Sequence, residues 1–386
     1  MNIREANYLQ TIHRRKNMSN KTISILKERR SAERRVIRAP NDIRGFVENG
    51  YCVLVEQDAG QDVGFSDSDY IDAGARISTQ DEAWRQASLV LKYKAPGPDE
   101  WKFFRPGLVV ASFMHAEGNM QFTEAMRSSG LTSYALEFFQ TPDGQFPVPI
   151  TDNEISGRLA VILGAYHLQS TFGGSGVLMS RVQGANPPNV VVIGYGNAGG
   201  GAALLAAAMG ANVTVFGTKR LGLHQFQAMM PPNILCKFNE PSAFEKAVLE
   251  ADLVVGAILI STHDTPEMLG EALVKRMKPG SMIVDVTCGY GKGYMPTFDK
   301  LTTHNQPVYT RFGIQHCKID AMPASVPLTA APATSANVAP YLLAMARDVI
   351  ENVPDPVSRT GRITHEHVVV HPEVLRHIAM EAALGN

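Results

Sequence analysis

Three polar side chains of this 386-residue chain stand at or just after expected strands, where the ligands of an open parallel sheet bind. Arg35 lies in the loop KERRSAERRVIRAP after a first strand, Lys94 ends the strand ASLVLKYK, and His115 ends the strand LVVASFMH. A guanidinium and an ammonium can hold a small carboxylate, and a histidine titrates near neutral pH. Together they suit hydride transfer at a carbon that bears an amine or hydroxyl beside a carboxylate. Taken singly, each could instead be a surface arginine, a solvated strand end or a hydrogen-bonded structural histidine.

A second candidate site is the glycine motif in NVVVIGYGNAGGGAALLAAAMGANVTVF, residues 189–216. The β-branched run from Val190 to Ile193 predicts a buried strand, and a helix and a second strand should follow. Glycines in G-x-G-x-x-G spacing allow a tight turn and a close approach to a pyrophosphate at the helix N-terminus. The alternative is a βα turn whose glycines serve packing only. The residues expected to bind a dinucleotide in this turn are Gly194, Gly196, Asn197, Ala198 and Gly199.

The end of the second strand of this motif lacks the acidic residue that binds the ribose 2′-hydroxyl in NAD-specific folds. Gly217 stands there, and Thr218, Lys219 and Arg220 follow it. No carboxylate would repel a 2′-phosphate, while two cations and a hydroxyl could bind one. We therefore expect NADP as the preferred cofactor, with NAD as the alternative. Lys219 and Arg220 could also simply begin a solvated helix.

The composition, with 45% hydrophobic and 19% charged residues, is typical of a soluble globular protein of about two domains. The net charge of −1 indicates no nucleic-acid partner, and no apolar run is long enough to predict a membrane span. Four cysteines without paired spacing fit a reducing cytoplasm. His365, His367 and His371 could bind metal, but we expect a polar surface segment there and no metal site.

Strands alternate with helices in both halves of the chain, which predicts an α/β protein with two Rossmann-like, doubly wound parallel-sheet domains. A helix over residues 154–169 connects the halves, and a late helix over residues 336–350 returns the chain to the first domain. The expected domains are an N-terminal extension (1–21), a substrate domain (22–160 with 330–386) and a dinucleotide-binding domain (161–329). Besides those of the glycine motif, strands are expected at residues 22–26, 51–56, 87–93, 108–113, 132–138, 253–260 and 282–287.

Several blocks, in order along the chain, resemble the alanine dehydrogenase and pyridine-nucleotide transhydrogenase α-subunit family. The resemblance covers residues 22 to about 350 and is carried by KERRSAERRVIRAP, LVLKYKAP, VASFMHAEGN, EISGRLAVILGAYHL, VVVIGYGNAGGGAA, MKPGSMIVDVT and MPASVP. It implies two domains with a cleft between them and usually an oligomer, so we expect a homo-oligomer. The resemblance assigns substrate binding to Arg35 and Lys94, which match the family's keto-acid-binding residues. It assigns catalysis to His115, with Lys94 beside it.

Three active-site positions depart from the family pattern. Gly289 stands where the family has an aspartate taken to be an acid/base partner, and Ala321 replaces an asparagine near the nicotinamide. The ribose-binding aspartate is also absent. Since the glycine motif, the cationic pair and the histidine remain, these changes suggest a different substrate and not a dead enzyme. The residues that could replace the lost carboxylate are Tyr290, Lys292 and Asp320.

These observations predict an NAD(P)-dependent oxidoreductase that transfers a hydride between nicotinamide and the α-carbon of an amino acid or its imine. Loss of the aspartate disfavours addition of free ammonia to a keto-acid such as pyruvate. It favours a preformed or cyclic imine, or an amine larger than ammonia, as in a specialised biosynthetic pathway. The expected partner is a small carboxylate substrate, with no nucleic acid and no membrane. Two alternatives stay open: a 2-hydroxy-acid dehydrogenase, and a non-catalytic nucleotide-binding or transhydrogenase-like protein.

Overall fold

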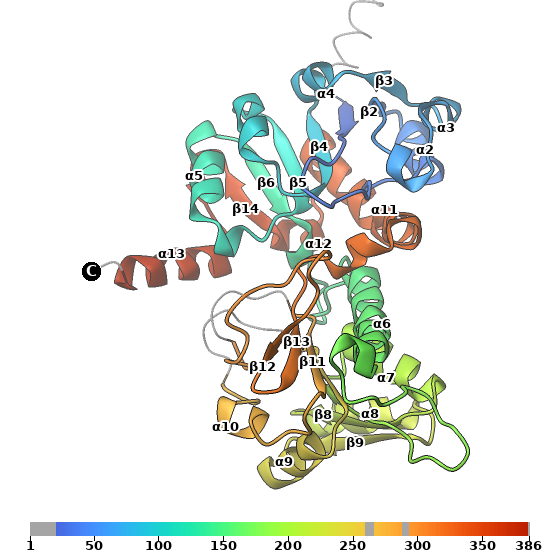
Figure 1. Ribbon diagram of the computed structural model, residues 1–386. Helices are drawn as coiled ribbons and strands as arrows, with labels where there is room; N and C mark the ends of the chain where they lie inside the picture. The colour runs from blue at the N-terminus through green and yellow to red at the C-terminus, as the bar shows by residue number, and fades with distance from the viewer. Residues whose placement is uncertain (1–20, 259–265, 288–292, 385–386) are drawn as a thin grey trace, which may run out of the picture. The chain divides into compact units, whose positions relative to one another are not determined.

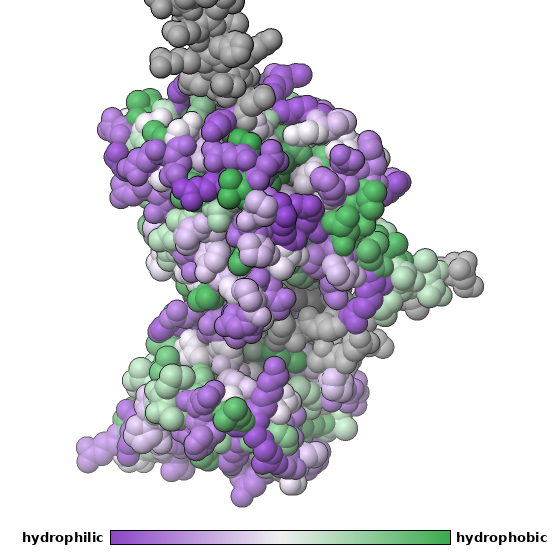
Figure 2. All heavy atoms as spheres, turned by 180° about the vertical axis from the view of Figure 1, so that it is seen from behind, coloured by the Kyte–Doolittle hydropathy of each residue, from purple (hydrophilic) through white to green (hydrophobic). Residues whose placement is uncertain are grey.

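The computed structural model describes residues 21–258, 266–287 and 293–384 (Figure 1). The chain divides into two compact units, residues 1–149 with 326–386 and residues 150–325. Gly289, Tyr290 and Lys292 lie outside the described residues. On the face that Figure 2 shows, hydrophilic side chains cover most of the described surface, with hydrophobic ones in small groups between them. Within the described ranges, no helix is long and apolar enough to cross a bilayer.

The first unit contains an eight-stranded sheet in the order β15-β14-β6-β5-β4-β1-β2-β3. Strands β1 to β6 run parallel, whereas β14 pairs antiparallel with β6, and β15 with β14. The strands are β1 (Thr22–Ile25), β2 (Cys52–Glu56), β3 (Arg76–Ser78), β4 (Leu89–Lys94), β5 (Val109–Phe113), β6 (Thr132–Ala135), β14 (Arg362–His365) and β15 (Val368–Val369). The helices are α2 (Pro40–Glu48), α3 (Asp67–Asp72), α4 (Gln80–Gln86), α5 (Met120–Ser129), α11 (Pro327–Glu351), α12 (Pro356–Thr360) and α13 (Pro372–Leu384), with short 3-10 helices η1 (Gln61–Val63), η2 (Pro98–Phe103), η3 (Ala116–Gly118) and η4 (Leu136–Phe138).

The second unit contains a seven-stranded sheet in the order β12-β13-β11-β10-β7-β8-β9. All neighbours pair in parallel except β12, which is antiparallel to β13. The strands are β7 (Asn189–Ile193), β8 (Asn212–Gly217), β9 (Ile234–Phe238), β10 (Leu253–Gly256), β11 (Met282–Asp285), β12 (Tyr309–Arg311) and β13 (Ile314–Cys317). The helices are α6 (Ile150–His167), α7 (Asn197–Ala208), α8 (Arg220–Ala228), α9 (Pro241–Leu249) and α10 (Glu271–Val274), with 3-10 helices η5 (Ser170–Phe172) and η6 (Met322–Ser325).

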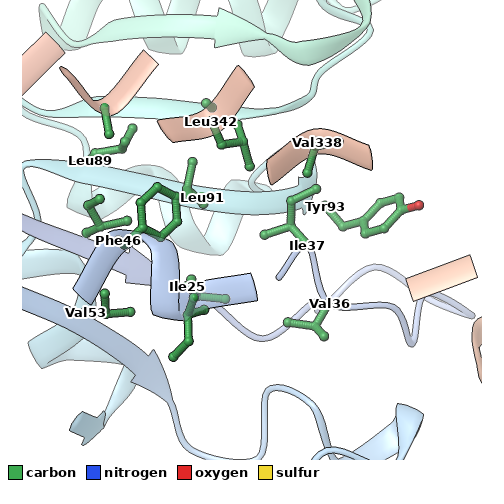
Figure 3. Close-up of a cluster of buried hydrophobic side chains, with 14 of the residues drawn as sticks. Ile25, Val36, Ile37, Phe46, Val53, Leu89, Leu91, Tyr93, Val338 and Leu342 are labelled. Atoms are coloured by element: carbon green, nitrogen blue, oxygen red, sulfur yellow. The ribbon is translucent and has the colours of Figure 1, made fainter. Parts of the chain in front are cut away.

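Alternate side chains of the first sheet enter two separate hydrophobic clusters, because successive residues of a strand point to opposite faces. Leu91 and Tyr93 of β4 pack in the cluster drawn in Figure 3, together with Val338 of α11. Val90 packs in the other cluster. β4 is therefore buried along its whole length, including Lys94 at its carboxyl end. A lysine in such a place needs a charged partner or a ligand.

The predicted fold class is confirmed, since both sheets are mostly parallel and carry helices between successive strands. The sequence analysis missed the antiparallel edges, which are formed by the short strands β12, β14 and β15. The expected domain boundary at residue 160 falls inside α6, and the whole of α6 belongs to the second unit. The late helix expected from residue 336 begins earlier, at Pro327, and α11 belongs to the first unit.

Candidate functional site

The glycine motif lies in the turn between β7 and α7. The fold itself requires two of its glycines. A Cβ at Gly194, whose φ is 102°, would overlap the carbonyl oxygen of Ala257, and a Cβ at Gly199 would overlap the carbonyl oxygen of Gly194. Gly196 differs, because a Cβ there would meet no described atom within 4 Å, and its φ of −74° suits any residue. Packing therefore explains two glycines, and the third leaves the space that the predicted close approach of a phosphate requires.

The first turn of α7 offers backbone donors at the same place. α7 begins at Asn197, and no side chain caps it at Gly196. The N–H groups of a helix's first turn have no partner inside the helix and attract anions. The structure thus brings together Gly194, Gly196, Asn197, Ala198 and Gly199, the five residues expected to hold a pyrophosphate.

Mutation of the two kinds of glycine separates binding from packing. We expect Gly196→Ala to keep the free energy of unfolding near that of the wild type. It should weaken binding of a pyridine nucleotide about tenfold or more, because its methyl group occupies the phosphate's side of the turn. Gly199→Ala should instead lower the free energy of unfolding by roughly 1–3 kcal/mol through overpacking. Urea unfolding and nucleotide fluorescence titration measure these effects, and unchanged binding in Gly196→Ala would leave a turn that serves packing only.

The loop after β8 lies beside the glycine motif, because β7 and β8 pair in register from Asn189 to Ile193. Gly217 is buried at the end of β8, and Thr218, Lys219 and Arg220 are exposed. Arg220 is the first residue of α8 and Lys219 its N-cap, so these cations do begin a helix, as the alternative interpretation expected. They also lie at the carboxyl edge of the sheet, where a nucleotide's ribose binds.

The Arg220 guanidinium lies over a ring from the neighbouring strand. Its Cζ is 4.0 Å from the centroid of Phe238, the last residue of β9. A guanidinium nitrogen is 3.3 Å from Glu240 Oε1, in an ion pair whose two side chains are both exposed. Such exposed pairs are weak, so Arg220 can exchange this partner for a phosphate.

A charged network that the sequence analysis missed lies at the carboxyl ends of β11 and β13. Asp285 Oδ1 accepts hydrogen bonds from the backbone and hydroxyl of Thr287 and from the Tyr294 hydroxyl, and its Oδ2 accepts one from Lys318 Nζ at 2.7 Å. This half of a doubly wound sheet receives the second nucleotide of a dinucleotide. Lys318 was missed because no strand was expected at residues 314–317. Asp320 follows it and is half-buried.

In the first unit, Arg35 is fixed by a buried ion pair. Its Nε and one terminal nitrogen each donate to Glu33 at 2.7 Å, in a bidentate pair, and its other terminal nitrogen donates to the Tyr93 hydroxyl at 2.9 Å. The side chains of Arg35 and Glu33 are only 1% and 2% exposed. The arginine donors and Lys94 outweigh burial and hold the pKa of Glu33 below its usual value. Arg35 is therefore not a surface arginine.

The two lysines of β4 differ in their partners. Lys92 Nζ donates to Glu100 Oε1 at 3.0 Å and lies 3.7 Å from Glu28 Oε2, so its charge is neutralised. Lys94 is equally buried, but no described residue forms a hydrogen bond or an ion pair with its ammonium. Lys94 does act electrostatically on Glu33 and on His115. At the end of β4, the Lys94 ammonium is thus ready for an anion, whereas that of Lys92 is already paired.

His115 follows β5 in a left-handed backbone conformation, with φ 46° and ψ 45°. The Glu137 carboxylate fixes this turn, because it accepts the backbone N–H groups of Met114 and His115 at 3.1 and 2.6 Å. The His115 Nδ1 atom is 3.8 Å from Glu117 Oε1 and 3.9 Å from Glu137 Oε1. Burial alone would lower the pKa of His115, but these carboxylates outweigh it and raise that pKa above its usual value. Strained backbone of this kind is common at functional sites.

Arg35, Lys94 and His115 come together because they follow β1, β4 and β5, which are neighbours in the first sheet. Arg35, Lys94 and Glu33 carry one net positive charge when ionised, which matches one carboxylate. Glu33, Glu117 and Glu137 were not among the expected site residues. A carboxylate two residues before Arg35 could have been noticed, but the roles of the other two depend on tertiary neighbours.

The histidines of the C-terminal segment are not gathered at a metal site. His365 and His367 are exposed, and the Nδ1 of each lies near an oxygen of the adjoining segment, Thr132 Oγ1 and Arg127 O respectively. His371 is buried and stacks on Phe138, which corrects the expectation that it is a surface residue. Among the described residues, no group of three or more His, Cys, Asp or Glu could hold a metal ion.

Comparisons with known protein families match almost the whole chain. Residues 24–149 match "Alanine dehydrogenase/PNT, N-terminal domain", and residues 160–372 match "Alanine dehydrogenase/PNT, C-terminal domain". The chain is 36% identical to an alanine dehydrogenase of Staphylococcus haemolyticus over 324 residues, covering 84% of this chain and 87% of that protein. It is also 36% identical to an alanine dehydrogenase of Mycobacterium tuberculosis over 360 residues, covering 91% and 95%.

Solved structures show the same fold. An L-alanine dehydrogenase structure matches with a TM-score of 0.85 at 33% identity, covering 93% of this chain and 99% of that one. A transhydrogenase from Sinorhizobium meliloti matches with a TM-score of 0.74 at 23% identity, covering 91% and 99%, and this similarity supports the fold alone.

Proposed function

The chain belongs to the alanine dehydrogenase/PNT family, and from that premise we propose that it transfers a hydride between nicotinamide and the α-carbon of an amino acid or its imine. The family uses NAD(H) or NADP(H), and the turn between β7 and α7 fits the pyrophosphate of either. When bound, the dinucleotide supplies or accepts the hydride. The chain's own residues bind the carboxylate and move the proton.

The observation that carries this proposal is that two buried cations, Lys94 and Arg35, both act on the Glu33 carboxylate. A buried cation without a counter-ion is costly, so its retention needs a compensating anion. A substrate carboxylate provides that anion, and Arg35, held flat by Glu33 and Tyr93, directs hydrogen bonds to it. By holding the substrate carboxylate, these two cations fix the position of the α-carbon that is bonded to it.

His115 handles the proton in this scheme. For reduction, a proton is added to the imine nitrogen, a hydride is added to the carbon, and the C=N double bond becomes a CH–NH single bond. For oxidation, the neutral imidazole takes the proton back. Carboxylates that raise the pKa of His115 keep it protonated over a wider range of pH, which favours the reductive direction.

We infer a preformed or cyclic imine, or an amine larger than ammonia, as the nitrogen partner, and not pyruvate with ammonia. Gly289 stands where the family's acid/base aspartate is expected, so the chain lacks that carboxylate to assist addition of ammonia. A preformed imine needs one protonation and one hydride, which His115 and the dinucleotide supply.

The experiment is a panel of carboxylates assayed by the absorbance of reduced nicotinamide. Turnover with a cyclic imine or a secondary-amine partner, but not with pyruvate plus ammonia, supports the proposal. Turnover of keto-acids without any amine would indicate a 2-hydroxy-acid dehydrogenase instead. Tight nucleotide binding without turnover on the whole panel would indicate a non-catalytic nucleotide-binding protein.

NADP is the cofactor that we propose to be preferred, because exposed Lys219 and Arg220 follow a strand end without a carboxylate. Replacing both with alanine should weaken the binding of NADPH much more than that of NADH, by roughly 1.5–3 kcal/mol per lost charged hydrogen bond. Fluorescence titration of both nucleotides measures the difference. The matched control replaces Lys275 and Arg276, an exposed Lys-Arg pair on the same unit, and should change neither affinity. Equal losses for NADPH and NADH in the first variant would contradict the preference.

The pH profile of imine reduction tests the surroundings of His115. His115 must be protonated, so kcat/KM should fall as the pH rises through its pKa. Glu117→Gln removes one carboxylate that raises this pKa, and the fall should then move to lower pH. The exposed Glu124 of α5 serves as the control, since Glu124→Gln should leave the profile in place. A Glu117→Gln profile that superposes on the wild type would show that another group sets this limb.

A further inference from the structure

The side chain of Tyr195, between the first two glycines of the motif, lies across the end of β8. A Cβ at Gly217 would be 2.5 Å from Tyr195 Cδ1 and closer still to Cε1, and a Cβ at Gly222 would be 2.7 Å from the Tyr195 hydroxyl oxygen. The hydroxyl donates to the carbonyl oxygen of Lys219 at 3.3 Å, and the ring centroid is 5.8 Å from that of Phe226. The aromatic ring thus packs against two positions without side chains and against the backbone between them.

This packing gives a physical reason for the missing ribose carboxylate. An aspartate at position 217 would need its Cβ where the Tyr195 ring stands, so the ring would have to leave its place beside Phe226 and Gly222. Because Tyr195 is half-buried, this displacement costs its contacts with α8 and its hydrogen bond to Lys219. The observed position of the Tyr195 ring therefore excludes an acidic residue at 217.

The same ring also organises the cationic loop. Through its hydroxyl, Tyr195 fixes the backbone of Lys219, the N-cap of α8. On the β9 side, Phe238 supports the guanidinium of Arg220. Two aromatic rings thus flank the loop between β8 and α8, at the edge where the neighbouring parallel strands β7, β8 and β9 end.

We propose that Tyr195 is a specificity-determining residue for the dinucleotide, because its ring excludes a ribose-binding carboxylate at position 217 and holds Lys219 and Arg220 toward a 2′-phosphate. The proposal rests on the proposed oxidoreductase function and its NADP preference. It adds to that function a second cause of the preference, because it assigns the preference to steric exclusion as well as to positive charge. Steric exclusion is a repulsive element of specificity.

A double-mutant cycle over Tyr195→Gly and Gly217→Asp tests the proposal, with dissociation constants of NADPH and NADH from fluorescence titration of the full chain without substrate. Gly217→Asp alone should weaken the binding of both nucleotides about tenfold or more, because the new side chain displaces the Tyr195 ring. With Tyr195→Gly also present, NADH binding should recover, and the NADPH-to-NADH preference should change by about 100-fold toward NADH. Such coupling is expected only of residues in contact.

Two further variants keep the cycle interpretable. Tyr195→Phe keeps the ring and removes the hydroxyl, so it should still prevent Gly217→Asp from binding NADH. Gly217→Ala adds the Cβ alone and replaces Gly217→Asp in the cycle if the latter does not fold, and it should weaken both nucleotides unless Tyr195→Gly is present. Independent effects of the two positions, with Gly217→Asp favouring NADH equally well beside tyrosine, would overturn the proposal. The wild-type ratio of the two affinities tests the NADP preference separately, so failure of one is distinguishable from failure of the other.

Discussion

Replacing His115 with alanine is expected to lower turnover about 10²- to 10⁴-fold, the usual contribution of a positioned acid–base group. The side chain is 23% exposed, so it is accessible to a ligand. Lys94, Glu117 and Glu137 act on its pKa, and the two carboxylates stabilise its protonated form. A second imidazole, that of His371, also acts on Glu117, but its ring is stacked on Phe138. Affinity for the dinucleotide should stay near that of the wild type, because the glycine motif belongs to the other unit. Steady-state turnover and nucleotide titration measure the two quantities.

A second variant separates chemistry from backbone strain. The backbone of His115 adopts the left-handed conformation, which asparagine tolerates better than alanine. His115→Asn should therefore fold as the wild type does and still lose turnover to the same extent, because an amide cannot exchange a proton near neutral pH. His365→Ala, at an exposed histidine of β14, is the matched control and should keep full turnover. Near-normal turnover in His115→Asn would remove His115 from the mechanism.

The parts of the fold that could be predicted are those with a strong local pattern. β7, β10 and β11 each contain a continuous hydrophobic run, as is typical of strands buried on both faces. β10 and β11 lie within expected strands, and β7 begins one residue before the expected run from Val190 to Ile193. β14 has four residues, most of them polar or charged, and β15 has only two valines, so no local period distinguishes either from loop. The pairing of β14 with β6 comes from tertiary contact, through Ser133 and Thr364, and β15 is added on β14.

In the candidate site too, some features could be predicted from local sequence and others depend on tertiary contacts. Parallel strands present their carboxyl ends at one edge, so the residues that follow strands could be selected from the sequence. The contacts that hold those residues in place could not be predicted from the sequence. Glu137 reaches the backbone of His115 because β6 adjoins β5, and the order of strands in a sheet is not a property of any single segment. Tyr195 is a similar case, since its effect on Gly217 depends on the register of β7 with β8.

The ion pair of Glu33 with Arg35 is the second place where a large effect is expected. Glu33→Gln keeps the shape of the side chain but removes the negative charge from the buried pair with Arg35, and removal of one partner from such a pair costs about 3–5 kcal/mol. The free energy of unfolding of the first unit should fall by that amount in urea titrations at neutral pH. Glu124→Gln, which breaks an exposed pair on α5, should leave the stability where it is.

The pH dependence gives this prediction a sign that can be checked. The folded pKa of Glu33 is lowered, so the pair stabilises the wild type at every pH above the unfolded pKa of about 4.3 and loses that contribution as the pH falls through the folded value. The difference between the wild type and Glu33→Gln should accordingly be constant at neutral pH and shrink in acid. A difference that persists unchanged at low pH would mean that hydrogen bonding by the side chain, and not its charge, holds Arg35.

Ligand linkage then connects this pair with substrate binding. Glu33→Gln removes the negative charge on which both Arg35 and Lys94 act, so a bound anion compensates more charge than it does in the wild type. A small keto-acid that binds the folded state stabilises it in proportion to the logarithm of its concentration over its dissociation constant. The keto-acid should therefore bind more tightly to Glu33→Gln and recover part of the lost stability, while Lys94→Met added to Glu33→Gln should abolish the recovery. If the keto-acid stabilises neither protein, the carboxylate is bound elsewhere and the two buried cations serve the fold alone.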